Sequence, residues 1–400
     1  MIRFLTAGES HGPALTAIVE GFPAGLRVEP ADLQIDLDRR RQGYGRGGRM
    51  KIEGDRVAVL SGIRHGVTLG SPITIQIENK DWERWHAVMA ATAGEATGMV
   101  TIAADERIAS LKARVTAPRP GHADLAGVQK YRQTDIRNIL ERASARETAA
   151  RVAVGALARL LLAEFGITVF SGVLRIGTAS VADLPVDLER YRHQVKESPV
   201  AAPDPVAAQQ MMAAIDAAKQ AGDSLGGEIE IIAQGVPVGL GSHVHWDRRL
   251  DARLAGALMS IPAMKAVGIG LGFEAAQRGG SEVHDEIFYQ AERGYYRETN
   301  NAGGIEGGIS NGELIRVRIA MKPIPTLYRP LRTVDLDTKQ PVEASVERSD
   351  TCAVPAAAVV AEAMVCWVLA EALVEKFGGD HLQAMYGHFQ QYLRELGASN

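Results

Sequence analysis

The feature that most limits the fold of this chain is an apolar run from Ala353 to Leu373. The run has nearly the length of a membrane-spanning helix. It contains Pro355, Glu362 and Glu371, however, and carboxylates are costly at membrane depth. We therefore predict a buried helix from about Pro355 to Phe377 and no membrane span. With 400 residues, the chain is long enough to bury a large core.

Composition is that of an ordinary globular protein and limits the partners. Hydrophobic residues make up 46% and charged residues 23% of the sequence. The formal net charge is −4, so a general attraction to nucleic acid is not expected. Cys352 and Cys366 form neither a disulfide framework nor a zinc pattern, which indicates a reducing compartment and predicts a cytoplasmic protein. The N-terminus lacks the apolar region of a secretion signal.

Hydrophobic periodicity predicts a mixture of strands and helices. Alternation of isoleucine with polar residues in 72–78 is typical of a strand with one buried face. Ser144 and Glu147 have capping-box spacing, so a helix should begin at Ala145 and run to about Phe165. Further strands are predicted at 2–6, 14–20, 56–60, 167–176, 228–233, 263–269 and 315–319, and further helices at 30–41, 205–221 and 250–259. Residues 79–112 show no clear pattern, and 178–204 are predicted to be loop-rich.

Residues 39–49 carry a dense cluster of positive charge. Five arginines and four glycines occur in these eleven residues, and no carboxylate falls among them. Arginine offers a planar fork of donors that matches carboxylate and phosphate groups. Glycine lets the backbone fold tightly around an anion. The stretch predicts a site for a small polyanion, with a solvated basic loop or an RNA-binding segment as alternatives.

Two histidines lie in glycine-flanked polar turns. His11 is in the sequence from Gly8 to Gly12, and His122 is in the sequence from Pro118 to Asp124. Each is a candidate acid or base, and each has a plainer alternative as an ordinary turn residue. His243 and His245 have no carboxylate or cysteine at a useful interval, so we expect no metal site.

Two other segments are interpreted from composition and context. Trp82 and Trp85 are expected to be packing residues rather than site residues. The glycine-rich run 300–312 is followed directly by an alternating strand, which makes it a better candidate for ligand contact than for a linker.

Eight ordered motifs resemble those of the chorismate synthase family, and they span residues 8–350. They are Gly8-Glu-Ser-His-Gly12, Arg41 to Met50, Arg119-Pro-Gly-His-Ala-Asp124, Arg142-Ala-Ser-Ala-Arg-Glu147, Asp223-Ser-Leu-Gly-Gly227, Asn301-Ala-Gly-Gly-Ile-Glu-Gly-Gly308, Lys322-Pro-Ile-Pro-Thr326 and Arg348-Ser-Asp350. Together they are far more specific than any one of them.

The resemblance implies a fold, a reaction and an assembly. The implied fold is α+β, with a helical core layer between antiparallel β-sheets, in a single domain over residues 1–400. The implied reaction is the 1,4-anti elimination of phosphate from 5-enolpyruvylshikimate 3-phosphate, which gives chorismate, the last common step of the shikimate pathway. The implied enzyme is a carbon–oxygen lyase of aromatic amino-acid biosynthesis that requires reduced FMN. The implied assembly is a homotetramer, without nucleic-acid or membrane partners.

The resemblance also implies roles for individual residues. His11 and His122 are implied as acids, the first for the flavin and the second for the leaving phosphate, and Asp350 is implied to help the proton leave. Ser10, Arg46, Arg49 and Arg348 are implied in substrate binding, and Arg40 and Arg46 match positions assigned to NADPH. The implied cofactor-binding set is Arg40, Arg46, Arg142, Ala143, Ser144, Pro262, Ala263, Gly307, Lys322, Pro323, Ile324, Pro325, Thr326 and Arg348.

The sequence departs from the family pattern in three places. Pro262 stands where many members have glutamine, so only a main-chain contact to flavin is expected there. The chain is longer than many bacterial members at residues 79–115 and at its C-terminus. The sequence does not decide whether NADPH or an external reductant reduces the flavin. A non-catalytic RNA-binding protein and another phosphate-handling enzyme remain as alternatives.

Overall fold

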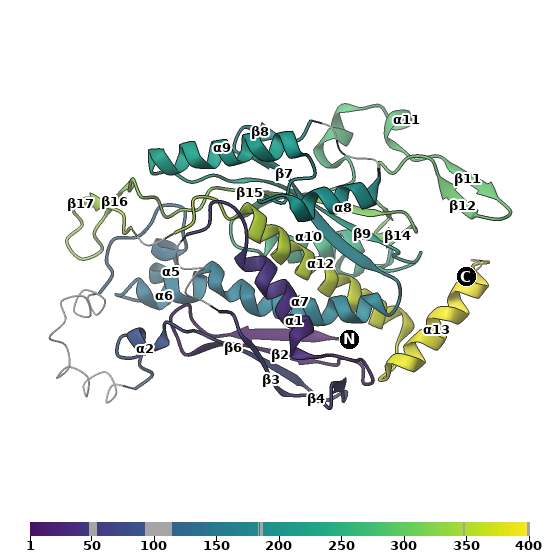
Figure 1. The fold of residues 1–400 in the computed structure, drawn as a ribbon, viewed down its shortest axis with the longest axis horizontal. Coiled ribbons are helices and arrows are strands. Elements are labelled where there is room, and N and C mark those ends of the chain that lie inside the picture. The colour runs from purple at the N-terminus through teal and green to yellow at the C-terminus, as the bar shows by residue number, and fades with distance from the viewer. Residues whose placement is uncertain (48–53, 93–113, 183, 185–186, 347–348, 398–400) are drawn as a thin grey trace.

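Two antiparallel sheets enclose a layer of helices (Figure 1). The computed structural model describes residues 1–47, 54–92, 114–182, 184, 187–346 and 349–397. Within these residues the predicted α+β architecture, a helical layer between sheets, is confirmed.

The first sheet has four strands in the order β1-β2-β6-β3. Its strands are Arg3–Ala7 (β1), Ala14–Glu20 (β2), Ile73–Glu78 (β6) and Val57–Ser61 (β3). The isoleucines of β6 are all about 1% exposed while their neighbours face outward. The alternation in the sequence therefore predicted which face of the strand is buried.

The second sheet has five strands in the order β10-β15-β9-β7-β8. They are Met264–Ile269 (β10), Ile315–Met321 (β15), Gly227–Gln234 (β9), Thr168–Ile176 (β7) and Ala179–Ser180 (β8). Every neighbouring pair is antiparallel. Two-stranded ladders surround the sheets: Ile63–Arg64 (β4) with Val67–Thr68 (β5), Ile287–Gln290 (β11) with Gly294–Arg297 (β12), Ile305–Glu306 (β13) with Ile309–Ser310 (β14), and Arg332–Val334 (β16) with Pro341–Glu343 (β17).

The helices between the sheets include α1 (Pro30–Arg41), α7 (Thr148–Ala163), α10 (Leu250–Met259) and α12 (Val354–Phe377). The start of α7 follows the predicted cap, because the Ser144 hydroxyl accepts the Arg146 N–H at 3.3 Å. A 3₁₀ turn over Ala145–Glu147 precedes α7. The predicted cap at Ser144 is thus confirmed, although the α-helix itself begins at Thr148, after the 3₁₀ turn.

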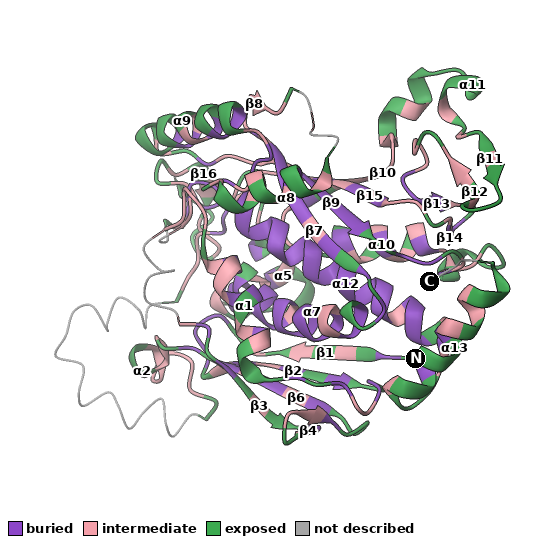
Figure 2. Cartoon of the chain, turned by 45° about the vertical axis from the view of Figure 1, so that its right-hand side comes forward, coloured by how far each residue is buried: buried purple, intermediate pink, exposed green. Residues whose placement is uncertain are grey.

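Helix α12 is the predicted apolar helix, and it lies inside the protein. Its length and composition would suit a membrane span, yet 94% of its most apolar window is buried. Figure 2 shows α12 and α7 as the buried centre of the molecule. Gly155 of α7 lies against Ala363 of α12, and a Cβ atom on Gly155 would come within 2.4 Å of the Ala363 Cα atom. The two core helices therefore meet backbone to backbone.

One fully buried carboxylate lies in this apolar helix. Glu362 is 1% exposed and accepts hydrogen bonds from Arg39 and Arg159 at 2.8 Å, and from Ser171 at 2.7 Å. Burial raises the pKa of Glu362, but the two guanidinium groups outweigh it and lower that pKa to about 2. The charge is tolerated because it is fully paired.

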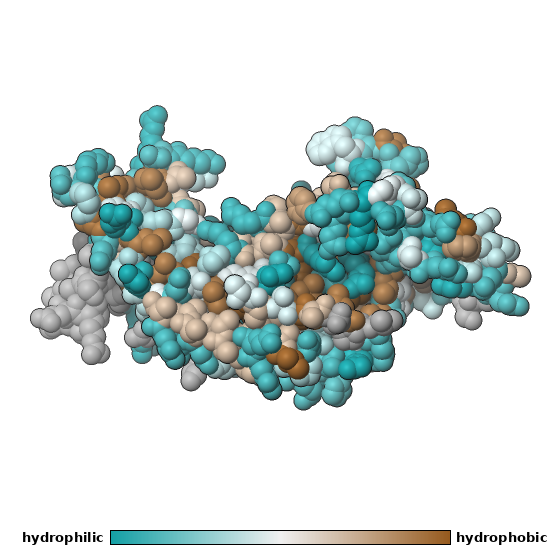
Figure 3. Space-filling model, turned by 90° about the horizontal axis from the view of Figure 1, so that it is seen from above, coloured by the Kyte–Doolittle hydropathy of each residue, from teal (hydrophilic) through white to brown (hydrophobic). Residues whose placement is uncertain are grey.

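The remaining helices lie around this sandwich. They are Trp82–Trp85 (α2), Asp124–Tyr131 (α5), Arg137–Ala143 (α6), Leu188–Glu197 (α8), Pro205–Ala221 (α9), Gly280–Val283 (α11) and Leu382–Glu395 (α13). Figure 3 views the molecule from the α9 side, a mostly hydrophilic face with hydrophobic side chains gathered near its middle.

The loop-rich prediction for residues 178–204 is wrong for α8. Asp187 caps this helix, because its carboxylate accepts the Glu189 N–H at 3.0 Å. Tyr191 then packs the helix onto β7 and is 1% exposed. The prolines on either side of the helix obscured this signal.

Both cysteines are buried and free. Burial raises the pKa of the Cys352 thiol to about 11 and that of Cys366 to about 12. Neither thiol is therefore ionised near neutral pH.

Candidate active site

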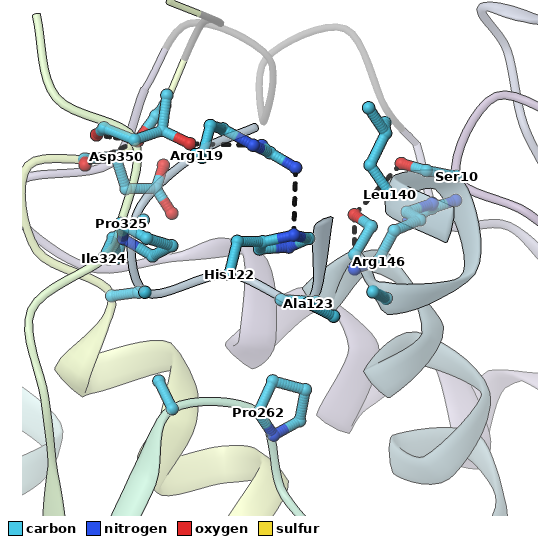
Figure 4. Close-up of a pocket in the computed structure, with 18 of the residues that line it drawn as sticks. Ser10, Arg119, His122, Ala123, Leu140, Arg146, Pro262, Ile324, Pro325 and Asp350 are labelled. Atoms are coloured by element: carbon cyan, nitrogen blue, oxygen red, sulfur yellow. Dashed lines mark hydrogen bonds between the residues drawn. The ribbon is translucent and has the colours of Figure 1, made fainter. Parts of the chain in front are cut away.

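A cavity of about 510 Å³ lies beside the starts of α7 and α12. Its walls come from segments far apart in the sequence (Figure 4). They include the turn after β1, with Ser10 and His11, the arginine-glycine loop after α1, with Arg46 and Gly47, and the extended segment 322–326 after β15. The predicted site residues that line it are Ser10, His11, Arg40, Arg46, His122, Ala143, Ser144, Pro262, Ala263, Lys322, Ile324, Pro325, Thr326 and Asp350. Most of the described candidates thus converge.

His11 is held by a buried carboxylate. Its backbone N–H donates to Glu141 Oε2 at 2.8 Å, and its Nδ1 lies 2.8 Å from Glu141 Oε1. The Glu141 side chain is 2% exposed. A carboxylate only accepts, so Nδ1 carries the hydrogen and Nε2 remains for other partners.

His122 is held in the same way from the other side of the cavity. Its Nδ1 lies 2.5 Å from Asp124 Oδ1 and 3.1 Å from Arg119 Nη2. The nitrogen cannot serve both, and the shorter contact indicates that Nδ1 donates to Asp124. Burial raises the pKa of Asp124, but hydrogen bonds from His122 and Arg119 outweigh it and hold that pKa well below its usual range. Asp124 is therefore a stable anion that fixes the His122 ring.

Asp350 is bound to the arginine-glycine loop. Its Oδ2 lies 2.6 Å from Arg46 Nη1, and its Oδ1 accepts the Gly47 N–H at 2.6 Å. The loop reaches this position because Gly45 has a φ of +85°, where a side chain would be strained. The main-chain oxygen of Gly45 also accepts the Thr351 N–H at 2.9 Å. The loop is thus packed onto the segment before α12.

Arg40 lies in the wall of the cavity and is 5% exposed. It donates to Thr148 Oγ1 at 3.1 Å, to the Ala145 carbonyl at 3.0 Å and to Asp55 at 3.3 Å. Asp55 is 1% exposed and also pairs with Arg146. Much of the hydrogen-bonding capacity of Arg40 therefore serves the protein itself.

The apolar wall and one further cation come from the segments around β10 and β15. The carbonyl of Ala263 accepts the Lys322 N–H at 3.0 Å, which joins the two segments. Lys322 Nζ donates to the Gly121 carbonyl at 2.5 Å. Burial, and then repulsion from Lys265, lowers the pKa of Lys322.

Several candidates are placed elsewhere. Of the described candidates, Arg142, Gly307 and Pro323 do not line the cavity. Arg142 donates to the carbonyls of Thr6 and Gly8, so it holds the His11 turn. Arg49 and Arg348 lie outside the described residues.

No group of metal-ligating side chains was found among the described residues. His245 pairs with Asp247 at 2.7 Å on the surface.

Sequence reasoning missed three residues at this site: Trp85, Glu141 and Asp124. The Trp85 ring stacks on His11 with centroids 4.0 Å apart. Trp85 is therefore a packing residue, as expected, but the residue it packs against is a candidate site residue. Asp124 had a local signal, because it lies two residues after His122. For Trp85 and Glu141 no local signal exists, since both meet His11 only through the fold.

These features define a class of protein. A cavity with apolar walls, two histidine–carboxylate pairs and several cations suits an enzyme that acts on a small anionic molecule.

Comparison with known proteins identifies the family. The model of the chorismate synthase family matches residues 2–374. The chorismate synthase of Geobacter sulfurreducens is 56% identical over all of both chains. That of Desulforamulus reducens is 58% identical over 99% of this chain and all of the relative. A crystal structure of chorismate synthase, 43% identical, superposes with a TM-score of 0.78 and covers all of this chain and 99% of that one. The chain belongs to the chorismate synthase family.

Proposed function

We propose that this protein removes phosphate from 5-enolpyruvylshikimate 3-phosphate by 1,4-anti elimination, giving chorismate, with reduced FMN as cofactor. Family membership supports the proposal. The observation that carries it is the convergence of His11, His122, Arg46 and Asp350 on one cavity. The substrate has two carboxylates and one phosphate, which accounts for a local cluster of cations in a chain of net charge −4.

The residues present fit a flavin. Pro262, Ile324 and Pro325 supply apolar surface for a flat ring system, and Arg46 and Lys322 supply cations for a phosphate. When bound, reduced FMN would supply the electron chemistry, as cofactors do in such reactions. The carbonyl at Pro262 remains available for a main-chain contact despite the missing glutamine side chain.

The chain supplies binding groups and protons. With Nδ1 held by Asp124, His122 can present a proton at Nε2 to the departing phosphate. Arg46 would offset the negative charge that develops as phosphate leaves. His11 would hold an exchangeable proton at Nε2 for the flavin, and Asp350 would receive the proton that the substrate loses. We further propose a single domain over residues 1–400 that assembles as a cytoplasmic homotetramer.

The test is anaerobic turnover of 5-enolpyruvylshikimate 3-phosphate with chemically reduced FMN, followed by chorismate absorbance. Turnover without flavin would overturn the cofactor assignment. A parallel reaction with oxidised FMN and NADPH as the sole reductant distinguishes self-reduction from dependence on an external reductant.

His122→Ala should lower turnover at least ~100-fold, the usual contribution of one positioned acid. His245→Ala is the matched control, because His245 also pairs with an aspartate two residues later, but on the surface. It should turn over normally. A His122→Ala rate near that of the wild type would remove His122 from the mechanism.

A further inference from the structure

We infer that Glu141 and Trp85 are positioning residues for His11, which together leave its Nε2 as the one ring nitrogen that exchanges a proton. The inference rests on the proposed function of His11. Neither residue is among the described residues that line the cavity, so each would act through His11 rather than on a ligand.

Glu141 fixes the tautomer. Its two oxygens receive the His11 backbone N–H and Nδ1–H, both at 2.8 Å. Arg137 Nη1 lies 3.7 Å from the same carboxylate and pairs with it. The backbone N–H and the ring Nδ1–H of His11 both donate to the buried Glu141 carboxylate. Rotating the imidazole would leave Nδ1–H unpaired, and this cost fixes the orientation of the ring.

Trp85 fixes the plane of the ring. The two rings are stacked with an interplanar angle of 26°, so the indole covers one face of the imidazole. The Arg137 guanidinium lies 5.0 Å from the Trp85 ring centroid, which joins indole and carboxylate through one cation. His11 is thereby held in plane by Trp85 and at its edge by Glu141.

The segment that carries Trp85 is tied to the His11 turn at a second point. The Asn79 amide donates to the carbonyls of Gly12 at 2.8 Å and Glu9 at 3.1 Å. The main-chain carbonyl of Asn79 also accepts the Trp82 N–H at 3.0 Å, at the start of α2. Asn79 and Trp85 therefore brace His11 from one segment of the chain.

The first test measures the tautomer in the free protein, by long-range ¹H–¹⁵N NMR of ¹⁵N-histidine-labelled chain, with His11→Gln to assign the signal. The wild type should show Nδ1–H. Glu141→Gln offers a single acceptor oxygen to two donors, so the His11 signal should change to a tautomer mixture or to Nε2–H. Glu147→Gln, another buried carboxylate that pairs with an arginine, is the matched control and should leave the signal unchanged.

The second test uses the fluorescence of Trp85, taken as the difference between wild type and Trp85→Phe. A protonated imidazole in contact with an indole quenches its emission, so the Trp85 difference should fall on acidification. The same difference, measured with and without Trp85→Phe in a His11→Gln background, should not depend on pH. Glu141 pairs with His11, and Arg137 pairs with Glu141. The cavity also places Arg40, Arg46, Arg119, His122, Arg146, Lys322 and Asp350 around His11, and all of these groups remain in these variants. The Trp82 signal, taken in the same way from Trp82→Phe, is the control. Trp82 lies on the same helix but contacts His86, so its signal should not respond to His11→Gln.

Kinetics complete the design. Trp85→Ala and Glu141→Gln should each lower kcat at least ~10-fold, part of the contribution of an acid–base group, with KM unchanged. Trp85→Phe should restore most of kcat, because phenylalanine still covers the ring face. An unaltered tautomer together with kcat within about 2-fold of wild type in both variants would overturn the inference. If the wild type itself fails to turn over, the proposed function falls, while the NMR and fluorescence results still decide the positioning role.

Discussion

Replacing Glu362 by glutamine should cost about 3 kcal/mol of folding free energy at neutral pH. Folding lowers the pKa of this carboxyl from its ordinary 4.5 to about 2. At about 1.4 kcal/mol per pKa unit, the shift corresponds to roughly 3 kcal/mol. This agrees in size with the roughly 3–5 kcal/mol lost when one partner of a buried ion pair is removed.

The sign of the pH dependence follows from the direction of the shift. A carboxyl whose pKa is depressed by folding contributes fully above its unfolded pKa and loses that contribution as the pH falls towards the folded pKa. The difference between wild type and Glu362→Gln should therefore be constant near neutral pH. It should narrow below about pH 4.5, by about 1.4 kcal/mol at about pH 3.5.

The assay is urea denaturation followed by far-UV circular dichroism at several pH values. Glu371→Gln is the matched control, because Glu371 lies on the same helix and pairs with Arg253 at 2.9 Å but is partly exposed. That variant should lose less than about 1 kcal/mol. A wild-type–Glu362→Gln difference that does not change with pH would refute an electrostatic origin and leave only altered packing.

Three further predictions concern the site and the helical layer. Asp124→Asn should lower turnover about 100-fold in the anaerobic assay, because the amide no longer fixes the His122 tautomer; an unchanged rate would contradict this. Gly155→Ala should destabilise the protein by ~2 kcal/mol or more in urea titrations, because its Cβ would meet the Ala363 backbone. Gly387→Ala, in open space on α13, should instead be neutral or gain up to about 1 kcal/mol, and equal effects would reject the argument. Arg40→Met should cost ~3 kcal/mol by leaving buried Asp55 short of a partner, and unchanged stability would show that Arg40 is held for a ligand instead.

The sandwich was largely predictable because its elements are strongly periodic. The alternating strand β6 and the helix α12, apolar on all sides, have few alternatives in a chain of this length. Helix α8 was not predicted, since flanking prolines outweighed the aspartate cap in the reading of residues 178–204. Helices α5, α6 and α13 were not predicted either. Helices α5 and α6, with 8 and 7 residues, depend on tertiary packing more than on their own pattern, whereas the 14-residue α13 was overlooked in the sequence.

The site was predictable where its chemistry is local and not where it is tertiary. Glycine-flanked histidines and clustered arginines predicted a candidate ligand site with plainer alternatives, and His11, His122 and Arg46 do line one cavity. Glu141 and Trp85 were missed because the fold brings them to His11 across long stretches of sequence. A single sequence contains no signal for such pairs.

The arginine-rich stretch contains no acidic residue of its own, yet the fold supplies partners for each of its described arginines. Arg39 meets Glu362, Arg40 meets Asp55, Arg41 meets Asp38, and Arg46 meets Asp350. The density of arginine therefore overstates the charge that remains for a ligand. An anion that enters the cavity must offer Arg46 a better partner than Asp350 at 2.6 Å. Phosphate and carboxylate groups, which accept the arginine fork in two places, meet that condition where neutral groups do not. Pairing of Arg46 with Asp350 therefore favours anionic over neutral ligands at this position.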